Sequence, residues 1–214
     1  MSIDETGLPE DALPADMENV MRMYRGNYAG VLAFDENVRP LRYVMTDDGH
    51  LIAPVMVAVL SSLNTVLFTP EEDEDALQVL VTPEELGGMD YCSAETDRWR
   101  VYHGEPKDVR WARLWVESLK LGPVVFDGET IALPNPFTEH EPRLCRVMND
   151  RRDDLRKLAK NMVGVEIPEP VMVGTDPWGI NIRAPFGVVR VNFPAKLESA
   201  DEFLPAVENM LSKN

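Results

Sequence analysis

The chain has 214 residues, of which 44% are hydrophobic and 27% charged, as is ordinary for a globular protein of one large or two small domains. Acidic residues outnumber basic ones by 37 to 21, and the net charge of −16 argues against binding to nucleic acid or to anionic lipid. The sequence has neither an apolar run long enough to span a membrane nor a secretory signal pattern, so we expect a cytoplasmic protein without membrane contact.

Residues 1–15 are acidic and lack periodicity, which predicts a mobile arm. Residues 16–25 have the period of a short helix that Asp16 can cap. Six short strands follow, and Asp47-Asp48-Gly49 is a strong hairpin signal because Asp-Gly tolerates positive φ. The strands are expected at 28–34, 41–46, 50–57, 64–69, 77–81 and 98–103. Such a series of short strands is typical of an all-β barrel.

Residues 107–121 carry apolar side chains at helical spacing, which predicts a helix. A further hairpin is expected from strands at 124–126 and 130–133. Pro134-Asn135-Pro136 then breaks the chain, and we place the end of a first domain, residues 16–134, at this point.

A second domain is predicted over residues 140–214. A long helix at 142–163 carries one apolar side, and Gly164 is a good stop signal for it. Strands are expected at 170–176, 180–184 and 188–193, and Ser199 opens a last helix with a capping-box pattern. The predicted fold class is therefore α+β, a split β-barrel followed by a helix–strands–helix module.

Two groups of motifs carry a resemblance to a known family. The strand at Ala29–Ala33, followed by Arg39-Pro40 and the aspartate–glycine hairpin, resembles the split barrel of the pyridoxamine 5′-phosphate oxidase-like superfamily. The C-terminal half resembles the domain that follows this barrel in haem-utilisation proteins and in a plant regulator that binds glutamyl-tRNA reductase. Its matching motifs are Met148-Asn149, Asp154-Leu155, Val173–Arg183 and Arg190–Pro194.

The family resemblance implies haem or FMN as a cofactor. At both sites the residues of this chain depart from the pattern that the family uses to bind the cofactor. The family helix reads His-Met-Asn-x-Asp-His-x-Asp, but Val147 and Arg152 stand at its two histidine positions, so this helix offers no imidazole to haem iron. Arg151 and Arg152 could instead bind an anion such as a carboxylate or phosphate, or simply pair with nearby acidic residues.

FMN stays an open alternative, although there is no Lys or Arg between Arg42 and Arg98 and the stretch carries an acidic run at 71–75. A flavin phosphate needs hydrogen-bond donors or cations. The candidates are hydroxyl and amide donors, flanking arginines, an aromatic ring and a histidine: Ser61, Ser62, Asn64, Thr65, Arg98, Arg100, Trp99 and His103. Trp99, Trp111, Trp115 and Trp178 could stack on a small planar ligand or fill the core.

Other reactive side chains give weaker signals. His50, His103 and His140 lack metal-ligand spacing, so we predict no metal site, and His103 is either a pocket residue or a surface histidine at a strand end. Cys92 and Cys145 are expected to be reduced thiols, although their spacing leaves a disulfide open.

The leading functional hypothesis is a ligand-binding or regulatory protein linked to flavin or tetrapyrrole metabolism. The alternatives are an FMN-dependent oxidoreductase and an acidic module that docks a basic protein partner. Split barrels have exposed strand edges that pairing can close, so a homodimer is also expected.

Overall fold

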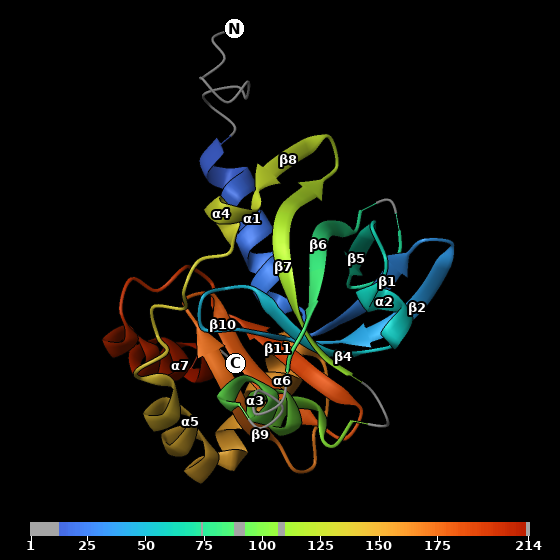
Figure 1. Ribbon diagram of the computed structural model, residues 1–214. Helices are drawn as coiled ribbons and strands as arrows, with labels where there is room; N and C mark the ends of the chain where they lie inside the picture. Colours follow the sequence, from blue (N-terminus) through green and yellow to red (C-terminus); the bar gives the residue numbers. More distant parts are fainter. Residues whose placement is uncertain (1–12, 74, 88–92, 107–109, 213–214) are drawn as a thin grey trace, which may run out of the picture.

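The computed structural model describes residues 13–73, 75–87, 93–106 and 110–212. Two antiparallel sheets lie next to each other with helices around them, which confirms the α+β class (Figure 1). The larger sheet has the order β2-β1-β5-β6-β7-β4-β3, with β8 paired to β7, and β2 also approaches β4, so the sheet curls toward a barrel. Its strands are β1 (Ala29–Phe34), β2 (Asn37–Arg42), β3 (Val44–Met45), β4 (Leu51–Val55), β5 (Thr65–Thr69), β6 (Leu77–Glu85), β7 (Arg110–Leu121) and β8 (Val124–Asp127).

The core of the larger sheet lies on its concave side. Alternate residues of each strand point inward, as Leu32, Leu67 and Val79 do, and all three are almost completely buried. Helix α1 (Leu13–Gly26) packs on this core through Val20 and Tyr24. The short helices α2 (Val57–Leu60) and α4 (Gly128–Ile131) complete it. The predicted arm thus overlaps α1 from Leu13 onward, and residues 1–12 lie outside the described part of the chain.

The smaller sheet has the order β11-β10-β9 and holds the C-terminal core. It consists of β9 (Val171–Asp176), β10 (Gly179–Ala184) and β11 (Gly187–Asn192), covered by α5 (Glu141–Asp150), α6 (Arg152–Val163), the 3₁₀ turn η2 (Ala200–Glu202) and α7 (Phe203–Ser212). Phe193 and Phe203 meet edge to face at 5.8 Å between ring centroids. The predicted helix–strands–helix order is confirmed.

The predicted helix at 142–163 is in fact two helices. The backbone of Arg151 leaves the helical region, with φ −109° and ψ 48°, and α6 begins at the next residue. Leu144, Met148 and Leu155 are still buried together, because the kink keeps the apolar sides of both helices on the same core. The break sets Arg152 at the start of α6.

The strand predicted at 98–103 is wrong, because helix α3 (Ala94–His103) occupies that segment. The Oγ of Ser93 caps the helix by accepting the N–H of Thr96 at 3.3 Å. Thr96, Trp99 and Tyr102 are buried at three-residue spacing, which is a helical pattern. Trp99 is buried and Val101, two residues further on, is exposed, which does not fit the alternation of a half-buried strand.

The helix predicted at 107–121 is also wrong, since its described residues form strand β7. Ala112, Leu114 and Val116 are buried at the two-residue spacing of a strand, and Leu119 is buried three residues further on. The register between β6 and β7 shifts between Leu80 and Val81, so one extra residue of β7 reverses the side to which later side chains point. That shift made the apolar spacing look helical. The strand predicted at 130–133 is likewise wrong, because the side chain of Asp127 caps helix α4 there.

Helix α3 contacts both sheets and forms a third apolar cluster where they meet. Its Trp99 and Tyr102 pack with Val44 and Ile52 of the larger sheet and with Val173 of the smaller one. Contacts of this kind fix the last turn of α3 at the junction of the sheets.

Across the described ranges, no helix combines the length and the apolar character needed to cross a membrane.

Candidate functional site

The junction between the sheets contains a buried polar cluster. Arg190 of β11 donates through both terminal nitrogens to Asp176, at 2.9 and 2.6 Å, and the two side chains are 8% and 5% exposed. One of these nitrogens also donates to Oδ1 of Asn181 at 2.9 Å. The Asp176 carboxylate more than offsets the effect of burial on Arg190, so the pKa of this guanidinium is raised. Arg190 and Asp176 thus form a buried ion pair in which the two charges neutralise each other.

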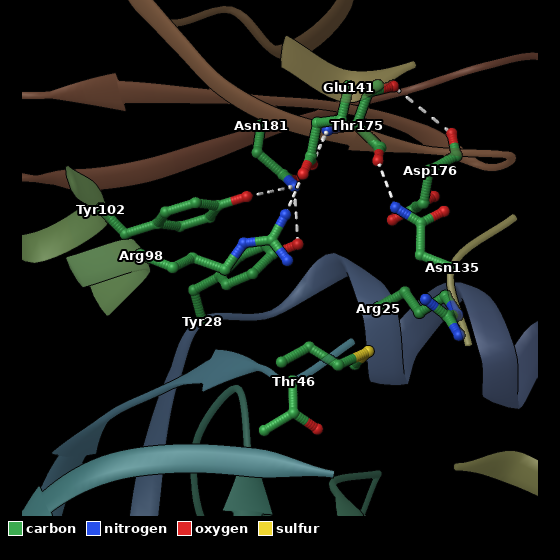
Figure 2. A pocket seen from close by; sticks show the side chains of 11 residues that line it. Arg25, Tyr28, Thr46, Arg98, Tyr102, Asn135, Glu141, Thr175, Asp176 and Asn181 are labelled. Carbon is green, nitrogen blue, oxygen red and sulfur yellow. Dashed lines mark hydrogen bonds and ion pairs between the residues drawn. The ribbon is translucent and has the colours of Figure 1, made fainter. Parts of the chain in front are cut away.

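A second ion pair joins α3 to α5 in the same cluster. Arg98 pairs with Glu141, whose other carboxylate oxygen accepts the N–H of Thr175 at 2.9 Å. Burial raises the pKa of Glu141, and the Arg98 guanidinium counteracts this in part. Figure 2 shows Arg98 and Tyr102 pointing from α3, and Tyr28 from the segment between α1 and β1, toward residues of α5 and the smaller sheet.

The phenol groups in the cluster are hydrogen-bonding groups and not acids or bases. Asn181 donates to the hydroxyl of Tyr28 at 2.6 Å and to that of Tyr102 at 3.4 Å. Burial raises the pKa of Tyr28 to about 12 and that of Tyr102 well above its ordinary value. Both therefore stay protonated at neutral pH.

The cavity inside this cluster is too small for a cofactor. Its volume is about 20 Å³, bounded by Arg25, Tyr28, Asn135, Thr175 and other residues of the cluster (Figure 2). One water molecule needs roughly 10–15 Å³ counted in this way, whereas ligand pockets span roughly 300–1,000 Å³. The cluster therefore holds the sheets together and has room for about one water, beside the buried Nε of Arg25, which has no partner within the described part of the chain.

A wider cleft opens on the other side of Tyr102, where α3, α6, β2 and the smaller sheet meet. Its volume is 470 Å³. Three arginines from three elements line it, namely Arg42 at the end of β2, Arg152 at the start of α6 and Arg183 in β10, together with one carboxylate, Glu169. We call this the arginine cleft.

Helix α3 fixes two of these arginines. The indole N–H of Trp99 donates to the backbone carbonyl of Arg42 at 2.9 Å. The guanidinium of Arg183 donates to the carbonyl of Val101 at 2.6 Å, near the end of the same helix. Among the described residues, the side chains of Arg42 and Arg152 make no hydrogen bond or ion pair, and both residues are exposed.

His103 forms part of the wall of the arginine cleft. Its Nε2 lies 2.9 Å from the carbonyl of Tyr43, which requires that nitrogen to be the donor. Burial lowers the pKa of His103 to about 4, so the ring is neutral at physiological pH. Its Nδ1 is then the acceptor, but it is buried and has no partner among the described residues, so neither ring nitrogen is open to bind an iron ion.

A second hollow of 350 Å³ adjoins the cleft, since Arg42, His103 and Gly187 line both. The tip of the β10–β11 hairpin stands between them, and its Phe186 is 61% exposed, which is unusual for so large an apolar side chain. Tyr28 and Val188 also line this second hollow, which we call the Phe186 hollow. Together the two spaces offer guanidinium donors on one side and an aromatic ring on the other.

The structure does not bring the eight predicted flavin-binding residues together. Ser62 donates to Asp35 at the far end of β1, and Thr65 begins β5, roughly 13 Å from the opposite strand end. Ser61 and Asn64 lie beside them at the end of α2 and before β5. Arg98 is engaged by Glu141, and Arg100 pairs with Asp97. These residues do not form one phosphate site that fits FMN.

The remaining predicted residues lie close to the arginine cleft. His103 lines it, and Trp99 supports it through Arg42. Of the predicted anion-binding pair, Arg152 lines the cleft, whereas Arg151 pairs with Asp154 at 2.8 Å. Trp99 and Trp111 are core residues in contact with each other, and Trp178 is buried over Arg25 and belongs to the barrel core.

Sequence reasoning missed Arg42, Arg183 and Glu169. Arg42 stands at the edge of the stretch without basic residues, and nothing near it in the sequence marks it as part of a site. Arg183 alternates with the buried Ile180 and Ile182 along β10, which placed its side chain on the opposite side of the sheet from the core. Nothing in the sequence indicated that these segments meet.

The thiol and metal predictions can be followed only in part. Cys145 is a free thiol whose pKa is raised to about 12 by burial, so it is not a thiolate nucleophile, and Cys92 lies outside the described residues. Within the described ranges, His, Cys, Asp and Glu side chains form no group of three or more that could hold a metal ion.

Comparison with known proteins yields similarity of structure only. No family model matches the sequence, and no curated protein matches it. A protein of unknown function from Agrobacterium tumefaciens is similar over 95% of this chain and 100% of its own, with a TM-score of 0.68 and 13% identity. A haem-binding protein from Mycobacterium smegmatis matches over 94% and 97% of the two chains, with a TM-score of 0.43 and 19% identity.

A candidate pyridoxamine 5′-phosphate oxidase from Listeria innocua covers 49% of this chain and 96% of its own, with a TM-score of 0.37 and 11% identity. At such identities the similarity concerns the fold, and the split-barrel fold expected from the resemblance in sequence is the one observed.

Proposed function

We propose that this protein is a ligand-binding or regulatory protein of the split-barrel fold, which takes a small planar molecule, a flavin or a tetrapyrrole, at the junction of its two sheets. The supporting observation is the continuity of the arginine cleft and the Phe186 hollow through Arg42, His103 and Gly187. Each space reaches the size that ligand pockets usually have. The exposed ring of Phe186 offers a flat apolar surface beside polar donors.

An FMN-dependent oxidoreductase is less well supported, because the polar residues expected to hold its phosphate are scattered over the barrel. Coordination of haem iron has no ready donor in the cleft either, since both nitrogens of His103 are engaged or buried and burial raises the pKa of the Tyr102 hydroxyl well above its ordinary value. A tetrapyrrole would therefore be held by its ring and side groups. Metal-free protoporphyrin should bind about as tightly as haemin.

Absorption and fluorescence titrations with FMN, protoporphyrin and haemin test this proposal. We expect saturable binding of at least one of them, weakened about threefold to tenfold by Phe186→Ala, because a stacked aromatic contact contributes about 0.5–1.5 kcal/mol. Leu63→Ala is the matched control, since Leu63 is 94% exposed and lines neither space. Absence of binding by all three compounds, or equal weakening by both variants, would contradict the proposal.

We also propose that the protein is a homodimer that pairs through the outer side of the larger sheet. Cross-strand partners on β2, β1, β5 and β6 place a row of apolar side chains there: Val31, Ala33, Val38, Pro40, Val66, Phe68 and Leu80. None of them belongs to, or packs against, one of the three core clusters. Contiguous apolar surface of this kind is typical of protein–protein contacts.

A second copy of the chain fits this surface better than a basic partner would. The seven side chains carry no charge, so two copies of a chain with net charge −16 can meet there without placing carboxylates against each other. Repulsion between the rest of the two chains should still weaken the dimer at low salt.

Sedimentation velocity tests the dimer. We expect a dimer for the native sequence and a monomer for Leu80→Glu, since Leu80 is 41% exposed at the β6 end of the apolar row, opposite Val66. Val163→Glu adds the same charge at a residue that is 42% exposed at the end of α6 and should stay dimeric. A native chain that is monomeric at every salt concentration would refute the homodimer.

A further inference from the structure

The contacts that the three arginines of the arginine cleft make within the fold do not neutralise their positive charges. Arg98 and Arg190 face carboxylates in the buried cluster, but the side chains of Arg42 and Arg152 have no such partner among the described residues. Arg183 uses one nitrogen on a neutral carbonyl, which leaves its charge uncompensated. Bringing like charges together costs free energy unless an anion joins them.

The local charge of the cleft is opposite to that of the whole chain. Three guanidinium groups and one carboxylate line it, and His103 is neutral, so the lining is positive although the chain carries −16. Salt screens charges beyond about 8 Å at physiological ionic strength, so a bound group is governed by the lining and not by distant acidic residues. The arginine cleft therefore attracts anions.

The donors also have the right chemistry and support. A guanidinium presents its N–H groups as a planar fork that matches the oxygens of a carboxylate or phosphate. Helix α3 holds the backbone of Arg42 through Trp99 and the side chain of Arg183 through Val101, so two of the three donors are positioned before a ligand arrives. Preorganised donors lose less conformational entropy on binding.

We propose that Arg42, Arg152 and Arg183 form a binding site for an oxyanion group, a phosphate or a pair of carboxylates, of a small-molecule ligand. The proposal deepens the function proposed above and rests on it for the rest of the ligand, whose apolar part would lie in the Phe186 hollow. Glu169 is the opposing charge in the same space and limits how tightly an anion is held. The site selects ligands that carry at least two negative charges.

Isothermal titration of the full chain with inorganic pyrophosphate and, separately, with citrate tests the site at about 0.15 M salt. We expect saturable binding of at least one probe, which identifies phosphate or carboxylate as the preferred group. Arg152→Gln should weaken it about fivefold or more, as expected for loss of a charged hydrogen-bond donor. Glu169→Gln should tighten it about threefold, because it removes the only carboxylate among the residues that line the cleft.

Arg143→Gln is the matched control, because Arg143 is exposed on α5, lines neither space and changes the net charge by the same amount. No saturable binding of either probe, or equal weakening by Arg143→Gln and Arg152→Gln, would overturn the oxyanion site. Binding of a probe that depends on Arg152, in a protein that binds neither FMN nor porphyrin, would refute the proposed function and leave the oxyanion site standing. Binding of FMN or porphyrin that depends on Phe186 but not on Arg152 would support the proposed function and overturn the oxyanion site.

Discussion

The buried polar cluster and the arginine cleft lie on either side of Tyr102 and use the same residue type in opposite ways. In the cluster, Arg98 and Arg190 are held by Glu141 and Asp176, and the remaining cavity of about 20 Å³ has room for about one water. In the cleft, Arg42 and Arg152 are exposed around 470 Å³ of space without a carboxylate partner among the described residues.

The difference indicates which charges hold the fold and which are available for a ligand. A buried guanidinium without its carboxylate would be costly, so the paired residues are tied to stability. An exposed arginine contributes little to stability, so its side chain is available to bind a ligand. The predictions below test that division, beginning with the largest expected effect.

Arg190→Met should destabilise the protein most, by about 3–5 kcal/mol, because it leaves the Asp176 carboxylate buried without its main partner. Urea denaturation measures the free energy of unfolding. Arg143→Met, at an exposed position on α5, should change it by less than about 0.5 kcal/mol. If the two variants were equally stable, the buried pair would have no structural role.

Gly174→Ala should cost about 1–3 kcal/mol through overpacking. A Cβ atom there would lie 1.8 Å from the hydroxyl oxygen of Tyr102 and 2.7 Å from Oε1 of Glu141. Gly87→Ala is the control, since no atom of the described residues beyond its chain neighbours lies within 4 Å of the Cβ position at Gly87. Thermal unfolding of the two variants should differ clearly, and an unchanged melting temperature for Gly174→Ala would show that the cluster adjusts freely.

His103 should make stability depend on pH between about 6.5 and 4. Its folded pKa of about 4 lies below the ordinary value, so the unfolded chain takes up a proton first as pH falls, and stability is lost through that window. The loss at pH 5 should be about 2 kcal/mol. His103→Gln cannot take up this proton and should lack that part of the pH dependence.

Denaturation of both proteins at pH 7.5 and pH 5 measures the effect. The exposed His140 supplies the control, and His140→Gln should follow the native protein at both values. A His103→Gln variant with the same pH dependence as the native protein would mean that the His103 ring is not held neutral in the folded state.

Arg152→Gln should have the smallest effect on stability, less than about 0.5 kcal/mol, because its side chain has no partner among the described residues. The same urea experiment used for Arg190→Met measures it. A loss comparable to that of Arg190→Met would place Arg152 among the residues that hold the fold and would remove the distinction between the two regions.

Much of the fold could be predicted because its signals are local. The Asp47-Asp48-Gly49 hairpin and the strands of the smaller sheet follow from turn residues and alternation within a few positions. Strand β7 and helix α3 could not be predicted in this way. The bulge in β7 depends on its pairing with β6, and the helical side of α3 depends on packing between two sheets. Both are tertiary effects.

The candidate site was predictable only residue by residue. Arg152 and His103 stood out because one replaces a family histidine and the other is an isolated imidazole. Arg42 and Arg183 looked like ordinary strand residues, and they meet Arg152 only because α5 and α6 break at Arg151 and α3 lies across the junction. Long-range assembly of that kind leaves no pattern within a single segment.

A crystal structure of the protein grown with pyrophosphate tests the central claim most directly, since it locates the bound group. The unpaired arginines predict density for the anion within hydrogen-bond distance of Arg42, Arg152 and Arg183, with the pairs Arg98–Glu141 and Arg190–Asp176 unchanged. Density for the anion elsewhere, or an arginine cleft without it at saturating pyrophosphate, would contradict the assignment of these arginines to ligand binding.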